Sequence, residues 1–258
     1  MTEIGTIYGV ILALLFAVAA GLVGSFALMK RMILAGDVIS HIALPGLGLA
    51  FLLHFNPLLG GAATLFLGTL LIWKLQKETG LATEVATGVV FAGSLAIGAA
   101  LTPKEDLIEA LFGKFAQLST GAFLIGVVAV VLIIYFVLHF KSALVLNLFS
   151  PDLAAATGVK LDRLNLLFLL VFSLTVLVGL RFFGAMLAGA LIMIPAATGR
   201  RLAHDLSHFL VASSLASVLA VGLGFILKAY VFRSLDLGPT IVIVSAALFG
   251  LSLARSAA

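Results

Sequence analysis

The sequence predicts an all-α protein, a polytopic bundle of eight or nine transmembrane helices. Hydrophobic residues make up 63% of the 258 residues and charged residues only 10%, whereas about 25% of the residues in an ordinary soluble domain are charged. The apolar residues fall into repeated runs, many of them near the length of about 20 residues that a helix needs to cross a bilayer. We therefore expect a single transmembrane domain over residues 1–258.

Nine apolar runs are the candidate membrane crossings. They are residues 7–29, 33–53, 58–73, 85–102, 121–139, 165–181, 183–198, 209–228 and 239–254. The first run follows Glu3 and no lysine or arginine. It therefore lacks the basic start of a secretory signal, and we expect it to be retained.

The run over residues 183–198 is the weakest candidate crossing. It is short and contains Gly184, Gly189 and Pro195, which favour a broken or partly re-entrant helix. Non-helical backbone at membrane depth is tolerated only where it is buried in protein or lines a cavity. These three residues, together with Pro45 in the second run, are therefore candidates for helix breaks or for the lining of a pore.

Basic residues in the links predict how the helices are oriented, because lysine and arginine are enriched in cytoplasmic links. If Lys30 and Arg31 are cytoplasmic, ten basic residues lie on that side and five on the other. The ten are Lys30, Arg31, Lys74, Lys77, Lys141, Lys160, Arg163, Arg200, Arg201 and Arg255. We therefore expect the N-terminus outside the cytoplasm and the C-terminus inside it.

The longest cytoplasmic link, residues 141–165, is expected to contain a short helix over residues 151–157 at the membrane surface. Ser150 can cap the N-terminus of this helix, and Pro151 suits its first turn. Asp152 lies near the positive end of the helix dipole, and Gly158 can adopt the left-handed conformation that ends a helix. From these residues alone, a simple connector and a docking surface are equally good interpretations.

Asp37, Ser40 and His41 place ionisable and polar groups inside an apolar run. A charged side chain at the bilayer centre costs at least about 2.5–3.5 kcal/mol, so it normally faces a cavity or a partner. The spacing of the three residues predicts that they share one face of a helix. Pro45 lacks an N–H group, so the carbonyl of His41 loses its usual helical donor.

Three interpretations of Asp37 and His41 remain open at this point. A carboxylate and an imidazole one turn apart suit zinc or manganese, but two ligands are too few to complete a metal site. The pair could instead form a buried hydrogen bond that holds two helices together, or take part in a proton relay. A second cluster, His204, Asp205 and His208, lies in a cytoplasmic link, where a solvated helix end explains it better than a metal site.

Several classes of function are disfavoured. The chain has no cysteine, so it cannot supply thiolate metal ligands or disulfides. It lacks the glycine-rich phosphate-binding loop and the His-Glu-x-x-His motif of a metalloprotease. We therefore expect no enzyme activity and no permanently bound cofactor, and nothing in the charge distribution indicates nucleic acid.

Seven segments occur in the order typical of one family. They are residues 30–41, 44–46, 88–91, 106–113, 150–159, 184–200 and 238–242. On these segments the chain resembles the membrane permease subunit of ABC importers that take up zinc, manganese or iron. Gly199 departs from the family pattern, in which an alanine is usual before the arginine.

The resemblance implies a location and a set of partners. The location is the prokaryotic plasma membrane, and two copies of the chain would form the pore. A separate cytoplasmic ATPase would hydrolyse ATP, and a metal-binding protein outside would deliver the ion. The outer segment 103–119, with Glu105, Asp106 and Glu109, would then either seat that protein or be a solvated acidic face.

The resemblance also implies roles for particular residues. Asp37 and His41 correspond to metal-contacting residues on the second helix, with Ser40 as a further candidate. The segment 150–163 corresponds to a coupling helix that meets the ATPase; its candidate contacts are Ser150, Pro151, Asp152, Leu153, Ala154, Gly158 and Arg163. An ABC permease for an organic cargo such as a siderophore or cobalamin is the alternative function, and an intramembrane enzyme or a structural scaffold is a remote one.

Overall fold

The computed structural model describes residues 2–32, 34–101, 118–158, 160–231 and 235–254, and the regular structure in these ranges is helical throughout. The helices are α1 (Thr2–Met29), α2 (Ala35–Ile42), α3 (Leu44–Leu52), α4 (Pro57–Thr79), α5 (Thr83–Leu101), α7 (Thr120–Phe149), α8 (Pro151–Ala156), α9 (Leu161–Phe183), α10 (Ala185–Leu202), α11 (Leu206–Tyr230) and α12 (Leu237–Ala254). The predicted all-α fold is confirmed. The acidic residues of segment 103–119 lie outside the described ranges.

Eight segments of the described chain are long and apolar enough to cross a membrane. They are Ile7–Met29, Ala35–Leu52, Pro57–Thr79, Thr83–Leu101, Thr120–Phe149, Leu161–Phe183, Leu206–Tyr230 and Leu237–Ala254. The predicted run 183–198 forms most of α10, a further helix of 18 residues with Arg200 and Arg201 in its last turn. The structure therefore confirms the prediction of eight or nine membrane helices.

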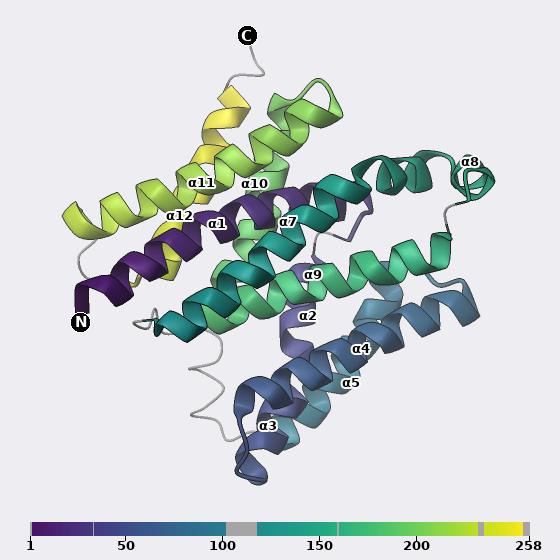
Figure 1. The fold of residues 1–258 in the computed structure, drawn as a ribbon, viewed down its shortest axis with the longest axis horizontal. Coiled ribbons are helices and arrows are strands. Elements are labelled where there is room, and N and C mark those ends of the chain that lie inside the picture. The colour runs from purple at the N-terminus through teal and green to yellow at the C-terminus, as the bar shows by residue number, and fades with distance from the viewer. Residues whose placement is uncertain (1, 33, 102–117, 159, 232–234, 255–258) are drawn as a thin grey trace.

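α1 and α10 run through the middle of the bundle (Figure 1). α1 packs against α7, α9, α10 and α11, while α10 packs against α1, α2, α9, α11 and α12. α3, α4 and α5 form a group at one side that meets the other helices through α2 and α9. Phe16 and Phe26 of α1 are buried, and their rings lie 5.1 and 6.5 Å from those of Phe183 and Phe168 in α9. These aromatic contacts fix the core between α1 and α9.

The ends of five helices meet around one cavity. Its lining includes Met29 at the end of α1, Lys77 near the end of α4, Thr83 at the start of α5, Phe149 at the end of α7 and Asp162 at the start of α9. We call this the α8 end of the bundle, because α8 connects α7 to α9 there (Figure 1). The order of these helix ends shows that the helices alternate in direction, as a polytopic membrane protein requires.

The short helix predicted over residues 151–157 is present as α8, and it ends at Ala156. Gly158 has φ +81°, so the predicted left-handed end is confirmed. The predicted capping role of the Ser150 side chain is wrong, because that side chain accepts no hydrogen bond from the first turn. The backbone carbonyl of Ser150 instead accepts from the Ala154 N–H at 3.0 Å.

The hairpin between α9 and α10 turns at Gly184, whose φ of +87° suits glycine. α10 then continues through Gly189 and Pro195 without a break. Of the three break candidates in this run, Gly184 is therefore the only one at which the helix is interrupted. The expected re-entrant loop is replaced by a continuous helix, because packing against α1, α11 and α12 encloses it on several sides.

Close packing of α3 on α4 depends on two facing glycines. A Cβ added to Gly60 would lie 2.2 Å from the carbonyl oxygen of Gly46, and one added to Gly46 would lie 1.9 Å from the carbonyl oxygen of Gly60. Backbones that approach this closely leave no room for a side chain. Gly60→Ala must therefore push the two helices apart.

We expect Gly60→Ala to lower the free energy of unfolding by about 1–3 kcal/mol, the usual cost of overpacking. Thermal unfolding of the purified chain in detergent measures this effect. Gly222→Ala in α11 is the matched control, since outside the adjacent backbone of its own helix no atom of the described residues lies within 4 Å of its added Cβ. Alanine is a better helix former than glycine, so the control should be unchanged or slightly more stable. Equal unfolding temperatures for the two variants would contradict the packing argument.

Candidate functional site

The candidate site lies where the second membrane segment changes from α2 to α3. α2 ends at Ile42 and α3 begins at Leu44, with Pro45 in its first turn. Proline has no N–H group, so the carbonyl of His41 loses its donor four residues on. Ala43 lies at the junction of α2 and α3, and its N–H donates to the carbonyl of Ser40 at 3.3 Å. The break that Pro45 predicts is therefore present, at Ala43, two residues after His41.

Asp37 lies at mid-depth in the bundle. The preceding residue, Gly36, faces Phe172 of α9 and Ile192 of α10, which lie within 4 Å of its added Cβ. Phe172 is at the middle of α9, which runs from Leu161 to Phe183. The carboxylate of Asp37 is nevertheless exposed on the surface of the single chain. Facing lipid at this depth would be costly, so the carboxylate requires water or another protein chain beside it.

Ser40 does not share the exposed face with Asp37. Its side chain is 2% exposed, and its hydroxyl donates to the Asp37 backbone carbonyl at 2.6 Å. Ser40 and His41 are consecutive residues, so they lie about 100° apart around the helix. The packing of α2 on α5, α9 and α10 buries the Ser40 side and leaves Asp37 accessible. The sequence prediction that all three residues share one face is therefore corrected.

His41 lies half-buried between α2 and α5. Its ring meets that of Phe91 edge to face, with centroids 5.8 Å apart. No hydrogen bond or ion pair joins Asp37 to His41 among the interactions of the described residues. The alternative of a buried Asp–His hydrogen bond that holds two helices together is therefore not what this structure contains.

Gly189 of α10 lies directly beside Asp37. A Cβ added to Gly189 would be 3.4 Å from the Asp37 Cβ and 3.5 Å from its Oδ1. Asp37 and Gly189 were two separate sequence candidates, more than 150 positions apart. Packing of α2 on α10 brings them together. Gly184 precedes α10 as its N-cap, and Pro195 lies about 9 Å along the helix from Gly189.

The described residues contain no group of three or more His, Asp or Glu side chains that could hold a metal ion. Asp37 and His41 could supply two ligands of a transient ion site. The other ligands would then come from water, backbone carbonyls or another chain. Such an incomplete site suits an ion that must also leave.

In the cluster of His204, Asp205 and His208, Asp205 is the N-cap of α11 and His208 lies in the first turn of that helix. The Asp205 carboxylate accepts from the His208 backbone N–H at 2.7 Å and lies 2.8 Å from His208 Nδ1. The backbone hydrogen bond is the main reason that the pKa of Asp205 lies below its ordinary value. The side chains of Asp205 and His208 are exposed, which agrees with the solvated helix end favoured from the sequence.

A further polar group was not found by sequence reasoning. Lys30 Nζ donates to Asn165 Oδ1 at 2.9 Å, across 135 positions of the chain. Neither residue stands out locally, since Lys30 follows α1 as an ordinary basic flank and Asn165 lies in the second turn of α9. Only the meeting of α1, α7 and α9 identifies this contact.

A bundle of membrane-length helices with an accessible carboxylate at mid-depth has the architecture of a membrane permease. The model of the ABC 3 transport family matches residues 5–256. The chain belongs to this family.

Relatives and a solved structure agree with the family assignment. The chain is 30% identical over 252 residues to the high-affinity zinc uptake system membrane protein ZnuB of Haemophilus influenzae, covering 95% of this chain and 94% of ZnuB. It is 30% identical to the manganese import system permease protein ScaB of Streptococcus gordonii, covering 93% and 87%. The structure of PsaBC from Streptococcus pneumoniae in complex with Fab superposes with a TM-score of 0.78 at 27% identity, covering 95% and 89%.

Proposed function

We propose that this chain is the permease subunit of an ATP-driven importer for divalent transition-metal ions, with zinc or manganese as the cargo. The observation that carries the proposal is the accessible carboxylate of Asp37 at mid-depth, one helical turn from His41. A carboxylate oxygen and an imidazole nitrogen are ligands that both metals accept. The relatives named for zinc uptake and manganese import support this cargo class.

The proposed pore contains a second copy of the chain. Asp37 is exposed on one chain, although its segment has the length and apolarity of a membrane crossing. Exposure to lipid would cost at least about 2.5–3.5 kcal/mol. A second copy related by two-fold symmetry would cover this face, and it would bring a second Asp37 and His41 to the same path.

The proposed energy source is a separate ATPase that docks on the cytoplasm-facing α8 end. α8 extends beyond α7 and α9 at this end of the bundle (Figure 1). Pro151, Asp152 and Leu153 are exposed there, and Ala154 is buried and anchors the helix. The basic links around the α8 end support a cytoplasmic location, which places the N-terminus outside. On the outer side, a metal-binding protein would deliver the ion.

The test is ATPase activity of the chain reconstituted with its ATPase and binding protein in liposomes, measured with one cargo at a time. We expect zinc or manganese to stimulate ATP hydrolysis and to accumulate inside. Stimulation by a siderophore or cobalamin without free metal would instead support the organic-cargo alternative and contradict the proposal.

A further inference from the structure

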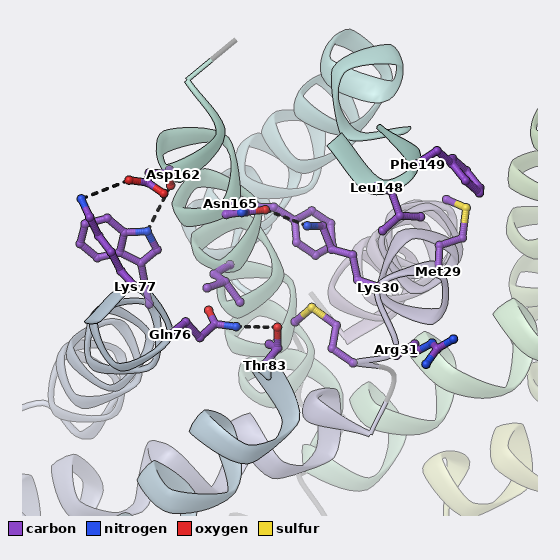
Figure 2. A pocket seen from close by; sticks show the side chains of 14 residues that line it. Met29, Lys30, Arg31, Gln76, Lys77, Thr83, Leu148, Phe149, Asp162 and Asn165 are labelled. Atoms are coloured by element: carbon purple, nitrogen blue, oxygen red, sulfur yellow. Dashed lines mark hydrogen bonds and ion pairs between the residues drawn. The ribbon is translucent and has the colours of Figure 1, made fainter. Parts of the chain in front are cut away.

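A cavity of about 580 Å³ opens at the α8 end of the bundle. It lies between the ends of α1, α4, α5, α7 and α9, and Figure 2 shows Lys30 in its centre. One part of its wall is polar and basic, with Lys30, Arg31 and Lys77. Another part is apolar and includes Leu148 and Phe149. The cavity is therefore amphipathic, and it lies where the apolar spans of α1 and α7 end.

Lys30 is a partly buried cation, and no acid of the described residues forms an ion pair with it. An ammonium has three N–H donors, and among the described residues Lys30 uses one of them, toward Asn165 Oδ1 at 2.9 Å. Its Nζ also lies 5.3 Å from the centre of the Phe168 ring. Burial lowers the pKa of the Lys30 ammonium below its ordinary value. A bound anion would compensate this desolvated charge.

The amide of Asn165 is held in place for this contact. Asn147 Nδ2 donates to the same Asn165 Oδ1 at 3.0 Å, which fixes the oxygen toward Lys30. Lys30, from the end of α1, is therefore positioned by residues of α7 and α9. Figure 2 shows the Lys30 side chain reaching into the cavity toward Asn165.

The other charges of the cavity leave it net positive. Lys77 pairs with Asp162 at 3.2 Å and lies 5.1 Å from the Trp73 ring centre. Trp73 Nε1 donates to the Asp162 carbonyl at 3.1 Å, so this acid is held on the side of Lys77. Arg31 has φ +57°, an uncommon conformation for a residue other than glycine. Asp162 is neutralised by Lys77, so among the described residues that line the cavity Lys30 and Arg31 are the charges without an acidic partner.

We propose that this cavity binds the headgroup of an anionic phospholipid, with the phosphate against Lys30. The cavity lies at the level where lipid headgroups sit, since α1 and α7 leave their apolar spans there. Phe149 is 73% exposed at its rim and offers an apolar surface to an acyl chain. A free metal cation would be repelled by Lys30 and Arg31, whereas basic pockets between membrane helices suit anionic headgroups. This inference does not depend on which cargo the protein carries.

The test is binding of short-chain phosphatidylglycerol to the purified full chain in detergent, followed by native mass spectrometry. Phosphatidylcholine of the same chain length and inorganic phosphate are the comparison ligands. We expect phosphatidylglycerol to bind more tightly than either, and added salt to weaken it. Lys30→Gln should weaken binding about fivefold, the value of one basic residue near an anionic headgroup, and Lys30→Arg should retain it.

Lys74→Gln is the matched control, because Lys74 lies on α4 near the same end, is 64% exposed and is paired with Glu78. This substitution should change lipid binding less than twofold, because an exposed ion pair contributes little free energy. Equal weakening by Lys30→Gln and Lys74→Gln would overturn the proposal, as would equal binding of phosphatidylglycerol and phosphatidylcholine by the unmodified chain. If inorganic phosphate bound as tightly as the lipid, the cavity would be a site for a free anion. If the lipid were lost when the ATPase was added, the cavity would be part of the ATPase docking site. Either result would overturn the lipid assignment.

Discussion

Asp37→Asn is expected to reduce metal uptake by the reconstituted importer at least about 10- to 100-fold, the range seen when support for a bound metal is lost. The substitution keeps the size of the side chain and removes its charge. Asp37 is accessible at mid-depth and makes no ion pair among the described residues, so the carboxylate has no evident structural task. Uptake of radioactive zinc or manganese into proteoliposomes measures the effect.

Glu78→Gln is the control for this experiment, because Glu78 is an exposed acid near the end of α4, with 63% of its side chain accessible. It should leave uptake unchanged.

A second experiment fills the space beside Asp37. Gly189→Ala would place its Cβ at an ordinary contact distance of 3.4 Å, whereas Gly189→Leu would crowd the carboxylate and should impair uptake. If Asp37→Asn transported like the unmodified protein, the ion path would have to lie elsewhere.

Leu153→Glu is expected to weaken docking of the ATPase at least about thirtyfold, which corresponds to the loss of a hot-spot residue worth about 2 kcal/mol. Leu153 is 59% exposed on α8, beyond the membrane-length parts of α7 and α9. An exposed leucine in this position offers an apolar contact to a cytoplasmic partner, and a glutamate would lose it. Co-purification with the ATPase and metal-stimulated ATP hydrolysis both measure the effect.

The thermal stability of the Leu153→Glu chain alone should not change, because its side chain is exposed. Ala154→Leu is the contrasting variant, since Ala154 is fully buried and a larger side chain should destabilise the fold itself. Charge reversal at Asp152 or Arg163, which are both exposed, should weaken docking less. Normal coupling in Leu153→Glu would leave α8 as a simple connector.

Several features of the fold were predictable because a bilayer restricts the composition and the length of each helix that crosses it. Each crossing must satisfy its backbone within one helix of about 20 apolar residues, so the helix positions follow from the apolar runs. Single residues predicted two further details of the backbone. Pro45 predicts the break after His41, and Gly158 predicts the left-handed end of α8. The family resemblance rested on the same segments and was confirmed by the match over residues 5–256.

The faces of the helices were decided by the tertiary structure alone. In a soluble protein, polar residues along one side of a helix show which side faces water. Lipid is as apolar as a protein core, so the sequence of a membrane helix does not show in this way which side faces outward. The burial of Ser40 and the contact of Asp37 with Gly189 therefore could not be read from the spacing. The pairing of Lys30 with Asn165 spans 135 positions and depends on how three helices meet. The sequence alone thus determined which segments cross the membrane and which ionisable residues they carry, whereas helix packing decided which of those residues share a site.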